Sequence, residues 1–171
     1  MFDFKKDSDE EEVKVEKPAY VPPVQRAPSV SLQDLFDSAG IKYFTAKEFQ
    51  TLGGSNSVEG SSGYGLNTLP PSELYPNILA VAIGWDEIRR RIGQPLYVNS
   101  CYRNEAYNKA VGGVRNSQHL DANAADVSGV SPKLMQRTAR ALRKEGWFKG
   151  GIGLYSSFCH VDIRGSNHDW G

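Results

Sequence analysis

Apolar residues recur at helical spacing in two long segments of the chain. The first spans residues 72–92 and ends before Gly93, and its apolar positions are Ile78, Ala82, Trp85, Ile88 and Ile92. The second runs from Ser131, the expected cap, to Glu145, and its apolar face is made of Leu134, Thr138 and Leu142. Spacing of three to four residues places side chains along one side of a helix, so both segments are predicted to be helices that pack on a core.

Three shorter helices are expected in the same way. One begins at Ser31, a second is capped by Thr45 with Glu48 three residues later, and a third covers residues 104–111 before a Gly-Gly pair. Residues 51–71 are rich in Gly, Ser and Asn and have no apolar period. We expect a long loop there, and loops of this length are usually either functional or disordered.

Strands are indicated by apolar residues that alternate with polar ones over short runs. They are expected at Leu96 and Val98, at residues 124–127, and in a hairpin of 151–155 with 158–163. Helices and strands do not alternate regularly along the chain, which argues against a doubly wound sheet. The predicted fold class is therefore α+β, with a small antiparallel sheet and flanking helices.

Composition divides the chain into a charged tail and one domain. The 171 residues are 39% hydrophobic and 23% charged, which suits one globular domain over residues 30–171. The first 17 residues carry seven acidic groups against four lysines, a net charge of −3, and prolines follow at once. Such a segment buries too little apolar surface to offset chain entropy, so residues 1–29 are predicted to be disordered. A tether, an arm that binds a protein partner and an inert tail all fit it.

Charge and composition exclude several classes of protein. A net charge of zero argues against a nucleic-acid binder, and no apolar run approaches the roughly 20 residues of a membrane span. The N-terminus lacks a secretory signal, so we expect the chain to be made in the cytoplasm and to leave it only if lysis frees it or a virion carries it. We also expect a monomer. Two cysteines exclude a disulfide-rich class and leave open whether Cys101 and Cys159 pair.

Candidate chemistry gathers in the last third of the chain, which holds all three histidines. His119 and Asp126 stand seven residues apart, and His160 lies in the middle of a predicted strand. Three such ligands and one open position are typical of a catalytic zinc site, where the metal lowers the pKa of a bound water to about 7. Spacing alone leaves the alternative open that each histidine is an ordinary core or surface residue.

The segment 99–127, NSCYRNEAYNKAVGGVRNSQHLDANAADV, closely resembles the signature of the zinc D-alanyl-D-alanine carboxypeptidases (peptidase family M15, subfamily A), which share a fold with hedgehog domains. That family carries Tyr-Arg, Tyr-Asn and Gly-Gly, then Ser-x-His-x-x-Gly-x-Ala-x-Asp, and later Phe-x-His-x-Asp. The matching residues are Tyr102, Arg103, Tyr107, Asn108, Gly112, Gly113, Ser117, His119, Ala124, Asp126, Phe158, His160 and Asp162. The resemblance covers roughly residues 44–164.

The resemblance implies a zinc peptidase that trims or cuts peptidoglycan stem peptides, as a D,D-carboxypeptidase or endopeptidase. Many members of the family are bacteriophage lysis or virion enzymes. The zinc ligands would be His119, Asp126 and His160. Arg103 would bind and polarise the substrate carbonyl or carboxylate, a role that suits a permanently charged guanidinium.

Other roles are less narrowly defined. Ser117 is expected to contact a polar group of the substrate, and Tyr155 either donates to the oxyanion or packs in the hairpin. Asp162 is a candidate general base, a partner that fixes a ligand imidazole, or an exposed strand carboxylate. His168 reaches the site only if the C-terminal segment folds back, and otherwise it is disordered.

One departure from the family pattern concerns backbone conformation. Ala122 stands where the family has glycine, which costs about 1 kcal/mol if that position requires a positive φ.

Two alternatives to an enzyme stay open: a non-catalytic zinc-containing binding module of the same fold, and a structural component of a virion.

Overall fold

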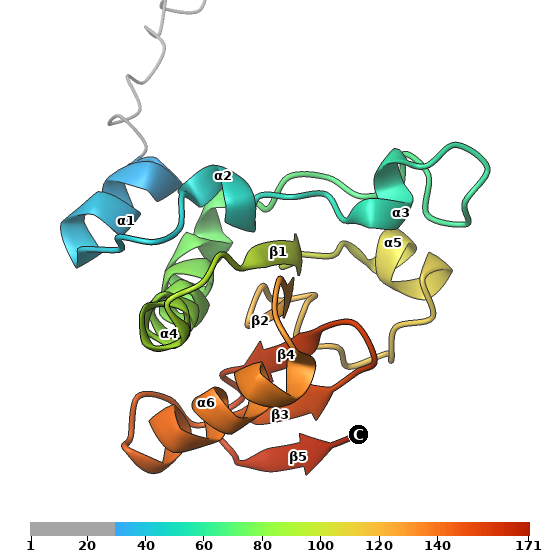
Figure 1. Cartoon of the computed structure of the whole chain (residues 1–171). Helices are drawn as coiled ribbons and strands as arrows, with labels where there is room; N and C mark the ends of the chain where they lie inside the picture. The colour runs from blue at the N-terminus through green and yellow to red at the C-terminus, as the bar shows by residue number, and fades with distance from the viewer. Residues whose placement is uncertain (1–29) are drawn as a thin grey trace, which may run out of the picture.

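The computed structural model of the chain describes residues 30–171, and the predicted tail at 1–29 lies outside the described residues. The helices are α1 (Leu32–Ala39), α2 (Ala46–Phe49), α3 (Gly54–Ser57), α4 (Tyr75–Ile92, preceded by a 3-10 turn at Ser72–Leu74), α5 (Glu105–Ala110) and α6 (Pro132–Lys144). The strands are β1 (Tyr97–Ser100), β2 (Ala124–Ser128), β3 (Gly151–Leu154), β4 (Cys159–Asp162) and β5 (His168–Trp170). The α+β class predicted from the sequence is confirmed (Figure 1).

Local signals in the sequence set most of these boundaries. Helix α4 ends at Gly93, whose φ of 69° is a left-handed conformation that glycine adopts without strain. At α2, the Glu48 carboxylate accepts from the Thr45 N–H at 2.7 Å, as expected of a capping box. At α5, the Asn104 side chain accepts from the Tyr107 N–H at 2.8 Å.

Helix α6 differs from the prediction in the face that it buries and in how it begins. Its buried residues are Met135, Gln136, Ala139 and Leu142. The packed face therefore lies about one residue beyond the predicted one, because Met135 and Ala139 fill it and Thr138 is only half-buried. The Ser131 side chain makes no capping hydrogen bond, so the helix start depends on Pro132 in the first turn.

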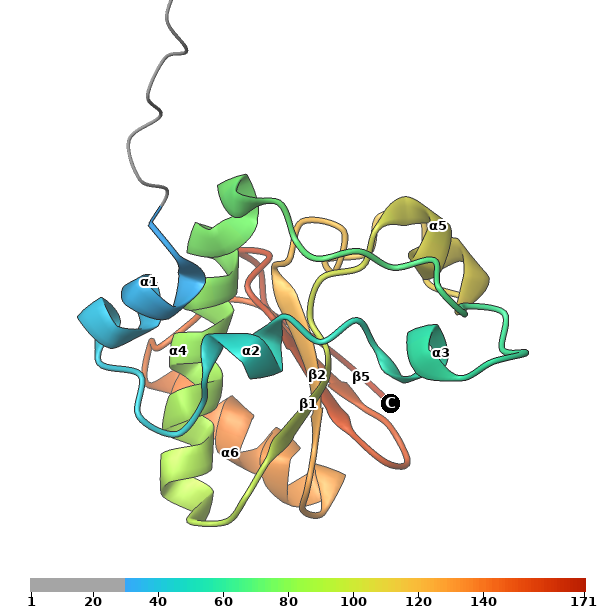
Figure 2. The same ribbon diagram turned by 90° about the horizontal axis from the view of Figure 1, so that it is seen from above.

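The five strands form one sheet in the order β1-β2-β4-β3-β5. The first three neighbouring pairs are antiparallel, as predicted, but β3 and β5 pair in parallel, so the sheet is mixed. β5 follows β4 and reverses direction, so it runs the same way as β3. Helix α6 contacts β3 and β4, and α4 contacts β2, so the two helices bury one face of the sheet (Figures 1 and 2).

The long loop at 51–71 is an ordered part of the fold beside α5 (Figure 2). The Ser62 hydroxyl donates to the carbonyl of Ala110 at 2.8 Å. A Cβ on Gly53 would come within 2.3 Å of the Tyr107 hydroxyl oxygen, so the loop lies against that ring where only glycine fits. No helix among residues 30–171 has the length and apolar character needed to cross a bilayer.

Candidate metal centre

Three buried side chains from separate parts of the chain meet on the face of the sheet that α4 and α6 leave uncovered. Asp126 on β2 lies directly opposite His160 on β4 in the antiparallel register. His119 comes from the turns that lead into β2. One donor atom from each side chain lies within 4.8 Å of the other two, a spacing that could hold a metal ion.

In each imidazole one ring nitrogen faces Asp126, and the other contacts a partner that holds the ring in place. His119 Nδ1 lies 2.6 Å from the carbonyl oxygen of Cys101, and His160 Nε2 lies 3.1 Å from Asp162 Oδ2. The remaining nitrogens, His119 Nε2 and His160 Nδ1, lie 3.3 and 2.8 Å from Asp126 Oδ1. Partners of this kind orient ligand histidines in metalloproteins, so the donor set fits a divalent cation with mixed nitrogen and oxygen ligands.

The charge states of two of the three groups, His119 and Asp126, suit a cation. Burial lowers the pKa of His119 and favours its neutral form, which is the form that binds metals. Burial raises the pKa of Asp126, but the two imidazoles oppose this and hold it well below its ordinary value. Burial likewise lowers the pKa of His160, and its hydrogen bonds to Asp126 and Asp162 reverse the direction, so the net shift is upward.

Arg103 lies beside this group, as the sequence predicts. Its guanidinium pairs with Asp126 Oδ2, the oxygen that does not face the histidines, and its Nε donates to Ser100 Oγ at 2.8 Å. The backbone N–H of Arg103 also donates to the carbonyl of His119 at 3.0 Å. The positive charge of the guanidinium is therefore held next to Asp126, at the edge of the three-residue group.

Asp162 lies behind His160, fully buried, so the interpretation as an exposed strand carboxylate is wrong. Its Oδ1 accepts from the Gly151 N–H at 2.8 Å, and both of its oxygens accept from Arg164. Burial raises its pKa, but His160 and Arg164 outweigh this and keep it below the ordinary range. This geometry fits the role of a partner that fixes the imidazole and offers none of its oxygens to a substrate.

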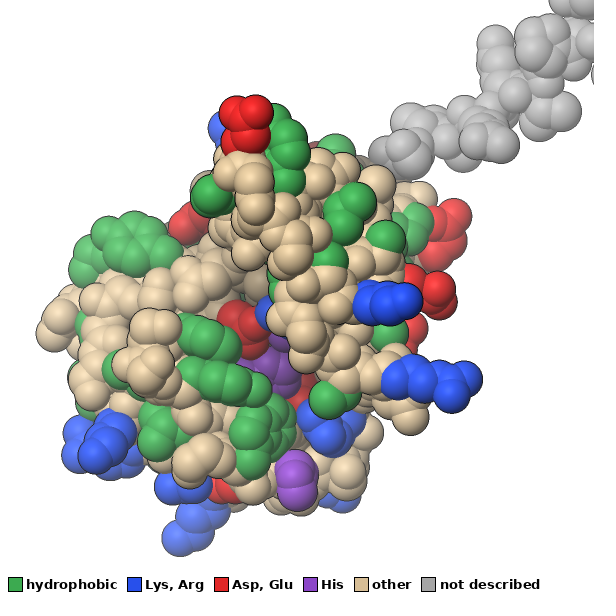
Figure 3. Space-filling model, turned by 90° about the vertical axis from the view of Figure 1, so that its right-hand side faces the viewer, with side chains coloured by type: hydrophobic (Ala, Val, Ile, Leu, Met, Phe, Trp, Pro, Cys, Tyr) green, Lys and Arg blue, Asp and Glu red, His purple; other side chains and the backbone are tan. Residues whose placement is uncertain are grey.

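An open cavity of about 570 Å³ lies over the three donor groups, and the space-filling view shows histidine and acidic side chains inside it (Figure 3). Ser117 and Tyr155 both line it. Ser117 Oγ accepts from the N–H of His119 at 3.3 Å, and the Tyr155 ring stacks on Phe158 at a centroid distance of 4.2 Å. Both are therefore within reach of a bound molecule.

Trp170 on β5 forms a side of the cavity that the sequence patterns did not predict. Its ring lies 5.1 Å from that of His160, and its Nε1 donates to the Tyr155 hydroxyl at 3.1 Å. A Cβ on Gly153 would come within 2.5 Å of the indole, so the glycine makes room for the ring. Alternating glycines at 151 and 153 of β3 were the available signal, because glycine in a strand often marks a close approach.

His168 and the two cysteines take no part in the cavity. The C-terminal segment folds back as β5, yet His168 is exposed and stacks on Trp170 at 5.6 Å outside the cavity lining. Cys101 and Cys159 are free and buried, so they do not pair. Burial raises the pKa of Cys159 to about 12 and keeps the thiol protonated at neutral pH.

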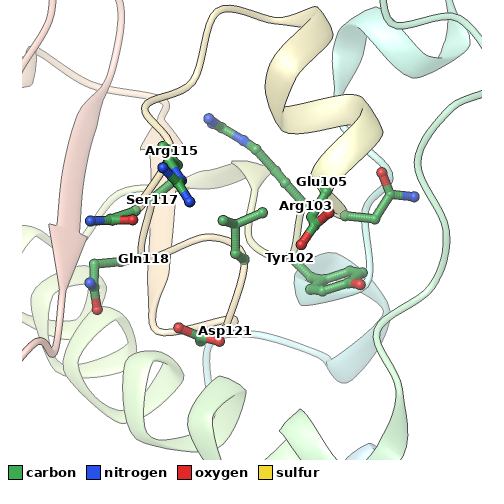
Figure 4. A pocket seen from close by; sticks show the side chains of 10 residues that line it. Tyr102, Arg103, Glu105, Arg115, Ser117, Gln118 and Asp121 are labelled. Carbon is green, nitrogen blue, oxygen red and sulfur yellow. The ribbon is translucent and has the colours of Figure 1, made fainter.

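A second cavity of about 520 Å³ adjoins the first and shares four lining residues with it: Arg103, Asn116, Ser117 and Gln118 (Figure 4). Its other lining includes Arg115, Glu105 and Asp121, so it carries both signs of charge. Ala122, which follows the lining residue Asp121 in the chain, has a φ of 54° and is the one non-glycine residue with a positive φ between residues 30 and 171. The positive φ on which the cost of about 1 kcal/mol depends is therefore present at this alanine.

Comparison with known protein families agrees with this geometry. The family model described as peptidase M15 matches residues 44–162, more than half of the chain. The chain belongs to the peptidase M15 family. This confirms the resemblance stated from the motifs, and as a family of peptidases M15 implies a peptide substrate. A search of curated proteins found no match to the chain.

Proposed function

We propose that this M15 chain is a zinc-dependent hydrolase of amide bonds in peptidoglycan stem peptides, as a D,D-carboxypeptidase or endopeptidase. The observation that carries the proposal is the His119–Asp126–His160 group at the base of an open cavity, with donor atoms within 4.8 Å of one another. A closed structural zinc site has four protein ligands and is mostly made of thiolates. Neither of the two buried cysteines belongs to the group of described residues that could hold a metal, so that group offers three protein ligands and no thiolate.

Each residue at the cavity has a separate role in this proposal. His119 Nε2, Asp126 and His160 Nδ1 would hold zinc, which when bound supplies a Lewis acid and an acidified water. Arg103 binds the scissile carbonyl or a neighbouring carboxylate and stabilises negative charge that develops on oxygen. Asp162 acts through His160 by holding its ring, and Ser117 and Tyr155 contact polar groups of the substrate.

One observation favours a second candidate, a non-catalytic zinc-containing binding module. Asp126 is the one carboxylate among residues 30–171 that lines the cavity over the donor group. A peptidase of this type commonly takes the proton of its attacking water with a separate base. A binding module has no need of such a group.

The deciding experiment is a mass-spectrometric product map. The zinc-loaded protein is incubated with intact peptidoglycan and with isolated muropeptides, with and without a chelator. We expect chelator-sensitive release of D-alanine or of new free amines, and the product identifies the bond. Retention of the substrate on the protein without any product would establish the binding module instead.

A further inference from the structure

Asn67 lies in the long loop at 51–71 and is buried, although it is remote in sequence from every residue of the metal centre. Its side-chain amide makes three hydrogen bonds to backbone groups. Nδ2 donates to the carbonyls of Leu52 and Tyr102, each at 3.0 Å, and Oδ1 accepts from the N–H of Asn104 at 3.0 Å. Both donor hydrogens and the acceptor oxygen of this amide are therefore engaged within the protein.

Two of the three partners are the residues on either side of Arg103. One amide group thus holds the carbonyl before Arg103 and the N–H after it. Asn104 returns the contact, because its Nδ2 donates to the carbonyl of Leu66 at 2.7 Å. With the Arg103 N–H already bonded to His119 at 3.0 Å, the backbone of this arginine is fixed from both sides.

We infer that Asn67 is a positioning residue for Arg103, so that the loop sets where the guanidinium lies beside Asp126. The inference rests on the proposed function only in so far as Arg103 contacts a substrate. A side-chain amide suits the task because it donates and accepts at the same time. Displacement of a catalytic group by about 1 Å can cost about 100-fold in rate, so the constraint has a measurable consequence.

The chain offers a matched control in the same loop. Asn56 is also buried, and its Oδ1 accepts from the N–H of Asn67 at 2.7 Å. It makes no hydrogen bond to residues 102–104 among those that the structure describes. The exchange Asn56→Asp keeps its acceptor oxygen, whereas Asn67→Asp removes the donor to Tyr102 and sets a carboxylate against two carbonyls.

The first test measures kcat and KM on the substrate identified by the product map. We expect Asn67→Asp to lower kcat about tenfold with KM changed less than about twofold, and Asn56→Asp to match the wild type. In an Arg103→Ala background, Asn67→Asp should cause no further loss, since it acts through the missing guanidinium. Wild-type kcat in Asn67→Asp, or the same fold loss in both backgrounds, would overturn the inference.

The second test does not depend on activity. The Arg103 Nε–H, which donates to Ser100, is followed by nitrogen–proton NMR in the zinc-loaded protein. Its resonance should shift or broaden in Asn67→Asp and in Asn67→Ser, and should be unchanged in Asn56→Asp. An unchanged resonance in a folded Asn67 variant would refute the positioning role. If the wild type cleaves nothing, the proposed function fails while this comparison still decides the inference.

Discussion

The two faces of the central sheet both carry buried side chains, and these side chains are opposite in character. On β2 and β4, Val127 and Val161 pack in the core with Ile152 of β3. One residue away on the same strands, Asp126 and His160 face the cavity, and both are also buried. Successive side chains of a strand point to opposite faces, so residues next to each other in one strand lie in different environments. One face therefore stabilises the fold by apolar packing, and the other presents the candidate metal ligands.

The largest effect is expected from His160→Ala, on the cavity face. The variant loses one of the three proposed ligands, so zinc content by elemental analysis should fall and hydrolysis should be abolished. Its neighbour Val161→Ala is the control and should keep its zinc. Full zinc occupancy in His160→Ala would refute the histidine as a ligand.

Arg103→Ala should separate charge stabilisation from metal binding on the same face. We expect zinc to stay bound and turnover to fall at least tenfold, and by about 10²–10³-fold if the guanidinium is an oxyanion donor. Steady-state kinetics on the mapped substrate measures the loss. Turnover close to that of the wild type would defeat the assignment of Arg103.

Ile152→Ala tests the opposite face. Ile152 is fully buried in the core, so the truncation should lower the free energy of unfolding by about 2–5 kcal/mol. Urea titration of the zinc-free protein measures this loss. Zinc content and kcat of the folded variant should equal those of the wild type, and a loss of zinc would show that the two faces are not independent.

The smallest effect is expected at Ala122, in the turn that leads into β2. Ala122→Gly relieves a left-handed alanine, worth about 1 kcal/mol, but removes a buried methyl group, worth about 0.8 kcal/mol. The free energy of unfolding, measured by urea titration, should therefore change by less than about 1 kcal/mol. Ala125→Gly, on the core face of β2, has no strain to relieve and should destabilise by about 1–2 kcal/mol. Equal losses at both sites would contradict the argument.

Sequence patterns predicted the features that depend on near neighbours in the chain. Helix α4, the capping box at Thr45 and the β3–β4 hairpin follow from local spacing. The motif resemblance alone was enough to name His119, Asp126 and His160, which the fold then brings together. The exact face of α6 did not follow, because both neighbouring registers of its apolar residues are plausible in isolation.

The features that were missed all depend on contacts between distant segments. β5 is a three-residue strand with two polar residues, and it pairs with β3 only because glycines there admit the indole of Trp170. Asn67 looks like any other polar loop residue until the loop folds over the segment at 102–104. No pattern in the sequence singles out Asn67, and for Trp170 the available signal was the pair of glycines at 151 and 153 of β3.

The placement of β5 has a consequence for local opening of the cavity. Trp170 reaches His160 and Tyr155 from a three-residue strand at the edge of the sheet, which pairs with β3 alone among the described strands. Asp126 and His160 lie on β2 and β4, each of which pairs with two other strands. Short edge elements open at a lower free energy than central strands, so the indole side of the cavity should open more readily than the side that carries Asp126 and His160.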